Sequence, residues 1–235
     1  MANSNCDIYL VNGNITVFCG THTETLKQDI LNSSLLGELA AISKHSESQD
    51  SLWAGFIETV SKIGWITKSR EFKRHDFSGK SLLKIIESSV GSSLTREEKD
   101  ALSKAFSILK KPGTHSPATQ RVVDKLQANT FACDETLGCA TARATIAGTT
   151  RVTIVRSNAS IITLQIAFKT TQGINIDILD HPVLDAIKDG KPNIWMLVSS
   201  LDARQYNALR ATVIKKLGNH IHDDLVHVIT PNPVV

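Results

Sequence analysis

The densest group of potential metal ligands lies near the end of the sequence. His220, His222, Asp223, Asp224 and His227 fall within one short stretch. Imidazole and carboxylate groups bind zinc and other divalent ions, and alternate residues share a face in an extended segment. Histidine also suits the negative end of a helix dipole, and a helix is expected to end just before this stretch. We weigh a metal site at His220, His222, Asp223 and His227 against a polar loop leading into a strand, and favour the loop.

A second candidate is the basic segment 62–84, in which seven Lys and Arg residues stand against two acidic ones. Aromatic residues are interleaved with them. Such a mixture can neutralise phosphates and stack on bases, or lie at an anionic membrane surface. The simpler interpretation is a solvated loop whose aromatic rings pack into the core. The candidate contact residues are Lys68, Arg70, Lys73 and Arg74.

The third candidate is the polar face of a sheet expected in the second half of the chain. Its simplest interpretation is an ordinary solvent-exposed face. It can also be a docking face for a partner or another copy, because threonine ladders lose little side-chain entropy on ordering. A membrane-inserting hairpin is a further alternative, since it needs amphipathic strands of about ten residues. The candidate residues on this face are Arg143, Arg151, Thr153, Thr163, Gln165 and Lys169.

Local catalytic and nucleotide-binding motifs are missing from the sequence. It has no GxxxxGK[ST] loop, no GxGxxG after a strand, no GxSxG elbow, no HExxH and no paired CxxC. Active sites also assemble from distant residues, so an enzyme with a non-local site is not excluded. We name no catalytic residue and expect no cofactor.

The elements that position these candidates begin with a hairpin. Asn12-Gly13 separates two β-rich runs, which is the strongest short-range signal for a hairpin with a type I′ turn. Cys6 and Cys19 flank the hairpin and can face each other across it. From 21 to about 130, apolar residues recur with a period near 3.6, which predicts a helical block.

Capping signals mark helix ends within that block. Ser78 is expected to cap a helix that ends at Gly91, and Thr95 and Glu98 have capping-box spacing.

After about residue 131 the apolar period changes from 3.6 to 2. This predicts an antiparallel, Thr-rich β-meander over about 131–180. The continuous apolar run 194–198 predicts a strand buried on both faces, followed by a helix that begins near Asp202 and ends at Gly218, and by a returning strand. The fold class is therefore α+β, and we expect one domain over 1–235. The alternative is a mainly helical 1–130 and a mainly β 131–235 with one long helix.

Composition indicates a globular protein. The chain has 235 residues, of which 41% are hydrophobic and 21% charged, with a net charge of +3. This mild charge excludes a histone-like binder and an acidic tail protein. The first residues contain neither a basic segment nor an apolar run, so we expect a cytoplasmic protein, or one released without a cleaved signal peptide.

Three classes of function compete on this basis. The leading hypothesis is a non-enzymatic protein that associates with copies of itself, in a homo-oligomer or a filament. The alternative is a soluble, membrane-acting, pore-forming α/β protein of the toxin kind, in which the helices shield the sheet and move aside at an anionic membrane. The third is an enzyme or nucleic-acid binder with a non-local site, and nucleic acid is the less favoured partner.

Overall fold

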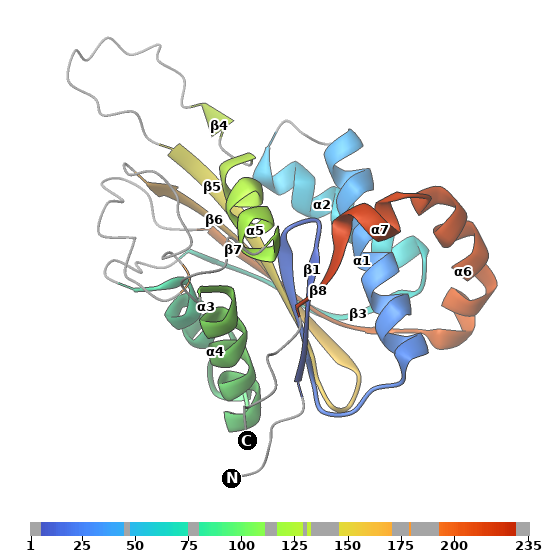
Figure 1. Cartoon of the computed structure of the whole chain (residues 1–235), viewed down its shortest axis with the longest axis horizontal. Coiled ribbons are helices and arrows are strands. Elements are labelled where there is room, and N and C mark those ends of the chain that lie inside the picture. The colour runs from blue at the N-terminus through green and yellow to red at the C-terminus, as the bar shows by residue number, and fades with distance from the viewer. Residues whose placement is uncertain are drawn as a thin grey trace.

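A computed structural model describes residues 6–44, 48–74, 80–110, 117–128, 131–132, 146–170, 179 and 193–228. Within these residues, one mixed β-sheet runs through the molecule and has helices on both of its faces (Figure 1).

The sheet joins strands from both ends of the chain and from its middle. Its order is β3-β7-β6-β5-β2-β1-β8, and β4 pairs with β5 beside this path. Neighbouring strands are antiparallel, except that β2 and β5 are parallel. The strands are β1 (Cys6–Val11), β2 (Asn14–Cys19), β3 (Trp65–Arg74), β4 (Phe131–Ala132), β5 (Ile146–Val155), β6 (Ser160–Thr170), β7 (Asn193–Leu201) and β8 (Leu225–Val228).

Two groups of helices cover the two faces of the sheet. One face packs against α1 (Glu24–Lys44), α2 (Gln49–Lys62), α6 (Ala203–Leu217) and the short α7 (His220–Asp224). The other packs against α3 (Leu82–Val90), which continues into a 3-10 turn (Gly91–Ser93), and against α4 (Arg96–Lys110) and α5 (Pro117–Ala128). The α+β fold class predicted from the two periodicities is confirmed.

Each face of the sheet has its own hydrophobic core. Val152 and Ile154 on β5 and Leu164 on β6 pack with α3, α4 and α5, and all three are 0% exposed. Residues that alternate with them point to the α1–α2 side, where Phe56 and Trp65 belong to the second core. The sheet is therefore buried on both faces at its centre, and only its edges reach solvent broadly.

The predicted hairpin is confirmed. Asn12 and Gly13 have φ of 48° and 79°, as a type I′ turn requires, and Cys6 pairs with Cys19 across the strands. Gly13 is needed for a second reason, because a Cβ there would lie 2.5 Å from the Cβ of Lys125 on α5. The turn thus packs directly against α5.

Several predicted helix ends are also confirmed. The Thr95 N–H donates to Glu98 Oε2 at 3.0 Å and the Glu98 N–H donates to Thr95 Oγ1 at 3.2 Å, which is a complete capping box. Gly91 and Gly218 end α3 and α6 with positive φ. Ser81 caps α3, whereas Ser78, predicted for this role, lies outside the described residues.

The prediction of a helical block from 21 to about 130 is wrong for one segment. Residues 65–74 form the strand β3, which pairs with β7 along its length. The period-2 signal is weak there because β3 is an edge strand whose two faces are both largely exposed, so polar residues occupy both. Pairing with a strand far along the chain decides the conformation.

The second half follows the predicted order where it is described. β5 and β6 form the antiparallel core of the expected meander, and β7, α6 and β8 form the expected strand–helix–strand unit. The alternating stretches 141–145 and 174–178 lie outside the described residues.

Candidate functional site

The polar residues predicted on the central strands lie inside the protein. The exposed fraction is 7% for Arg151, 4% for Thr153, 0% for Thr163 and 1% for Gln165. Because α1 and α2 cover this face of β5 and β6, the prediction of an exposed or docking face is wrong for these four residues. A period-2 pattern identifies residues that share a face, but it does not say whether a helix covers that face.

Threonines form a row across three central strands on this covered face. Thr16 on β2 pairs with Thr153 on β5, which pairs with Thr163 on β6. The Thr153 and Thr163 hydroxyl oxygens are 3.4 Å apart, and each of the three residues is at most 4% exposed. We call these residues the threonine row.

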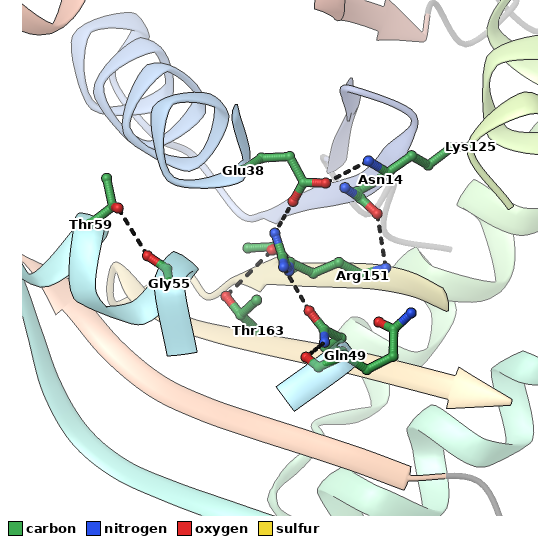
Figure 2. Close-up of polar contacts among 10 residues, drawn as sticks. Asn14, Glu38, Gln49, Gly55, Thr59, Lys125, Arg151 and Thr163 are labelled. Carbon is green, nitrogen blue, oxygen red and sulfur yellow. Dashed lines mark hydrogen bonds and ion pairs between the residues drawn. The ribbon is translucent and has the colours of Figure 1, made fainter. Parts of the chain in front are cut away.

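Arg151 lies next to this row and organises a buried ionic cluster (Figure 2). Its guanidinium forms an ion pair with Glu38 of α1 and donates from Nη2 to Gln165 Oε1 at 2.7 Å. The guanidinium also lies over the Phe56 ring, 4.0 Å from its centre. The Arg151 backbone N–H donates to Asn14 Oδ1 at 3.0 Å. We call Asn14, Glu38, Lys125, Arg151 and Gln165 the Arg151 cluster.

Lys125 reaches Glu38 from α5 because of an offset in the sheet. β2 pairs with β5 only from Val152 onward, so the earlier part of β5 lies beyond the hairpin turn, against which α5 packs. From there Lys125 Nζ approaches Glu38 Oε1 to 2.6 Å. The Glu38 carboxylate thus bridges two cations from two different elements.

The cations determine the charge state of Glu38. Burial alone would raise the pKa of its carboxyl, but Arg151 and then Lys125 outweigh burial and lower this pKa to about 2. Burial lowers the pKa of Arg151, and Glu38 partly offsets this. A guanidinium nevertheless stays charged at any physiological pH, so the cluster holds two cations and one anion.

A cavity of about 20 Å³ lies between Glu38, Leu52, Arg151 and Gln165. This volume is room for about one water molecule. The cavity is too small for an organic substrate, so the Arg151 cluster does not have the geometry of an active site. Its chemistry is that of a structural tie between α1, α5 and the sheet.

Polar side chains also fill the interface that α1 makes with its surroundings. Trp65 Nε1 donates to Ser33 Oγ at 2.8 Å, which links α1 to β3. The polar residues that α1 buries are Lys27, Asp29, Asn32, Ser33, Ser34 and Glu38. The α1 side of the sheet therefore buries more polar side chains than the α3–α5 side, but it also has its own apolar core, and Asp29 pairs with Arg210 of α6 rather than with the sheet.

The start of α2 is attached to the sheet by two further hydrogen bonds. Gln165 Nε2 donates to the Gln49 carbonyl oxygen at 3.0 Å, and Trp195 Nε1 on β7 donates to Asp50 Oδ1 at 3.0 Å. The sheet thus holds both helices of the α1–α2 pair through polar groups.

The basic residues predicted from segment 62–84 lie on the edge strand β3. Lys68 donates to Ser160 Oγ at 3.3 Å, and Lys73 donates to the Ser89 carbonyl oxygen at 2.7 Å. Arg70 and Arg74 are exposed, and no hydrogen bond or ion pair joins either guanidinium to another described residue. The predicted loop is thus a strand that presents two guanidinium groups with no partner among the described residues.

The histidine-rich stretch does not converge on a metal site. His220 Nδ1 lies 2.7 Å from Asp224 Oδ2 within α7, and His227 stacks on Tyr9 at 4.5 Å between ring centres. His222 and Asp223 are exposed. Across the described ranges, no three His, Cys, Asp or Glu side chains gather as metal ligands.

Two candidate residues lie wholly or partly outside the described part of the chain. Arg143 lies outside the described residues, and so does the side chain of Lys169, although its backbone belongs to β6.

Sequence reasoning missed Glu38, Lys125 and Asn14. One signal was available, because Glu38 follows Leu35 by three residues and precedes Ile42 by four, which places a carboxylate on the apolar stripe of a helix. A carboxylate at such a position implies a buried cation. Nothing local identifies Arg151 or Lys125 as that cation.

Comparisons with known proteins return weak similarities. No family model matches the chain, and no curated protein matches it. A solved structure of the Evf virulence factor matches with 11% identity and a TM-score of 0.37, over 95% of this chain and 84% of that one.

Two further solved structures are a delta-endotoxin and the activated Cyt2Ba monomer of Bacillus thuringiensis subsp. israelensis. The delta-endotoxin is 10% identical with a TM-score of 0.35, over 79% of this chain and 80% of that one. Cyt2Ba is 9% identical with a TM-score of 0.37, over 81% of this chain and 98% of that one. Because these similarities are weak, the function of this chain is inferred from its own residues.

None of the helices in the described part of the chain has the length and apolar character needed to cross a membrane.

Proposed function

We propose that this protein acts on membranes by inserting the β5–β6 hairpin into a lipid bilayer after the covering helices move aside. The observation that carries the proposal is the two-sided character of this hairpin. Val152, Ile154 and Leu164 line one face, and the polar side chains of Arg151 and Thr163 line the other, with both faces covered by separate helix layers. An inserted strand needs one apolar face for lipid and one polar face for water.

The lengths of the strands fit this role. β5 has 10 residues and β6 has 11, joined by the tight turn 156–159. A tilted strand crosses the hydrocarbon core with about 9–11 residues. Both strands therefore reach the required length without further chain.

The interface between the α1–α2 helix pair and the sheet includes buried polar groups beside its apolar core, and these polar groups lower the cost of releasing the helices. When polar groups leave a protein interface they regain hydrogen bonds with water, so separating a polar layer costs less than separating an apolar one of equal area. The threonine row and the Arg151 cluster lie in this layer. The apolar core beneath α3–α5 resists exposure to water, but its strand side chains are suited to lipid.

The threonine-bearing face of β5 and β6 offers no exposed surface for self-association, because α1 and α2 bury it. The sheet edges offer poor replacements. β3 carries four cations and one carboxylate, so two copies pairing there would juxtapose like charges, and β8 is only 4 residues long. Association through another surface stays a prediction, and light scattering on the purified 25.6 kDa chain tests it.

Release of an encapsulated dye from phospholipid vesicles tests the membrane proposal. We expect the wild-type protein to release dye, and a chain that releases none over a range of lipid compositions and pH values would refute the proposal. The informative variant is Thr153→Val with Thr163→Val. These residues are directly opposed, so replacing both by an isosteric apolar residue removes a hydrogen-bonded pair together and is nearly neutral for folding.

We expect this double variant to fold and to release less dye, because the inserted hairpin loses polar groups from its water-facing side. The matched control is Ile154→Val with Ile162→Val, an opposed pair on the other face of the same hairpin. The control keeps an apolar lipid-facing side and should retain release. Equal release by the two variants would contradict the assignment of the two faces.

A further inference from the structure

The edge strand β3 combines exposed apolar and cationic side chains. Phe72 is 57% exposed and Ile66 is 50% exposed, the two highest values among the large hydrophobic residues of the described part of the chain. The same strand carries Lys68, Arg70, Lys73 and Arg74 against Glu71. Phe72 lies on the same face of the strand as Arg70 and Arg74, whereas Ile66 pairs with Ser200 and lies on the other face.

Three of these side chains form a stripe on one face of the strand. Arg70, Phe72 and Arg74 pair in register with Leu197, Trp195 and Asn193 of β7, so all three lie on the α1–α2 side of the sheet. The Phe72 ring packs on Trp195 with 5.5 Å between ring centres. We call Arg70, Phe72 and Arg74 the arginine stripe.

The cations of β3 differ in how far they are already engaged. Lys73 is bound to the Ser89 carbonyl oxygen and lies 2.9 Å from Glu71, and Lys68 is bound to Ser160. Arg70 and Arg74 have no such contact with any described residue. Within the described part of the chain, the two guanidinium groups that flank the exposed aromatic ring are thus the cations of β3 without a partner, and we assign them to an external anion.

We propose that the arginine stripe docks the protein on anionic phospholipid bilayers. The inference rests on the proposed function and adds to it the surface of first contact and the class of lipid. Guanidinium groups bind phosphate oxygens bidentately, and the half-exposed Phe72 ring is suited to the interfacial layer of a bilayer.

One observation favours a bilayer over a nucleic acid. Phe72 is the one exposed aromatic ring of β3, because Trp65 is only 3% exposed, whereas a single-stranded nucleic acid stacks successive bases on several rings. Ile66, the other exposed apolar residue of the strand, pairs with Ser200 and therefore lies on the opposite face of β3, outside the stripe. The charge of the strand is complementary to acidic lipid.

The docking surface also connects to the helix pair that must move. Trp195 packs on Phe72 and donates a hydrogen bond to Asp50 at the start of α2. Only the Trp195 side chain therefore separates a bilayer that contacts Phe72 from the hydrogen bond that attaches α2 to the sheet.

Sedimentation with vesicles measures docking separately from dye release. For Arg70→Ala with Arg74→Ala we expect a partition coefficient on vesicles rich in phosphatidylglycerol about 25-fold below wild type at low salt, from about fivefold per cation. Binding of wild type should weaken as salt rises. The matched control is Lys215→Ala with Lys216→Ala, which removes the same charge from exposed positions in α6 and should bind nearly as wild type.

A second pair of variants tests the apolar contact. We expect Phe72→Ala to lower the partition coefficient about fivefold, since roughly half of the ring remains to be buried in the interface. Ile214→Ala is the control, because Ile214 is 42% exposed on α6 and lies outside the stripe.

The docking inference is overturned if the arginine variant binds acidic vesicles as tightly as the lysine control. It is equally overturned if wild type ignores vesicles while binding a labelled oligonucleotide that the arginine variant does not bind. Charge-dependent docking without any dye release would support the stripe and refute the proposed insertion. Dye release that is unaffected by the arginine substitutions would refute the stripe and leave the insertion proposal standing.

Discussion

Replacing Glu38 by glutamine tests the Arg151 cluster most directly. Glutamine has nearly the same shape and helix propensity as glutamate, so the substitution removes a charge and little else. Arg151 and Lys125 would then remain next to each other without the carboxylate that bridges them. Their side chains are only 9% and 10% exposed, so water cannot replace the lost anion efficiently.

The expected size of the effect follows from the pKa of Glu38. Its fall from 4.5 to about 2 corresponds to about 3 kcal/mol of favourable interaction with the ionised carboxylate. Removing one partner of a buried ion pair typically costs about 3–5 kcal/mol, which agrees. For a chain of this size the Tm should fall by about 6–12 °C.

The same pKa defines the pH at which the effect disappears. Because the pKa of Glu38 is lowered in the folded protein, its stabilising contribution is present above pH 4.5 and is lost as the pH falls towards about 2. The difference in unfolding free energy between wild type and Glu38→Gln should therefore shrink over this interval. At neutral pH we also expect the variant to release vesicle dye faster, since α1 is held less firmly.

Urea unfolding at a series of pH values measures both quantities. Glu58→Gln is the control, because Glu58 forms its ion pair with Lys62 on the exposed side of α2, where such pairs contribute about 0–1 kcal/mol. A loss for Glu38→Gln no larger than that of the control, or a loss that does not change with pH, would refute the assignment of Glu38 as the buried counterion.

Three further substitutions or reactions test the fold around the site. Gly13→Ala should cost about 2–4 kcal/mol in urea unfolding, because its φ is +79° and the added Cβ meets Lys125; a neutral result would show that the turn does not pack on α5. Cys19 should react very slowly with a thiol reagent at mildly alkaline pH, because burial, reinforced by the negative charge of Glu98, raises the pKa of its thiol to about 12. Thr95→Ala should cost about 0.5–2 kcal/mol in the same unfolding assay by removing half of the capping box, and a smaller loss would contradict the cap.

Some features of this protein follow from short stretches of sequence. Asn12-Gly13 specifies its turn because both residues accept positive φ at low cost, and Thr95 with Glu98 specifies a helix start because each side chain reaches the other's backbone. The alternation along β5 and β6 specifies which residues share a face. In each case the interacting groups lie within a few residues of one another, so local geometry is sufficient.

Other features depend on partners that are distant in the sequence. β3 is a strand because β7 pairs with it, although its own residues lack a clear apolar period. Among the described residues, the metal-like spacing near His220 gathers no group of three ligands, because His220 pairs only with Asp224 of its own helix and His227 stacks on Tyr9 of β1.

The polar face of β5 and β6 shows most clearly which features the sequence specifies and which depend on the tertiary structure. The sequence by itself determined that Thr153, Thr163 and Gln165 lie on one side of a hairpin whose other side is apolar. Only the tertiary structure decided that α1 and α2 cover the polar side and that Glu38 meets Arg151 there. The physical reason is that side-chain alternation is a property of one strand, whereas burial and charge pairing depend on where other elements of the chain pack.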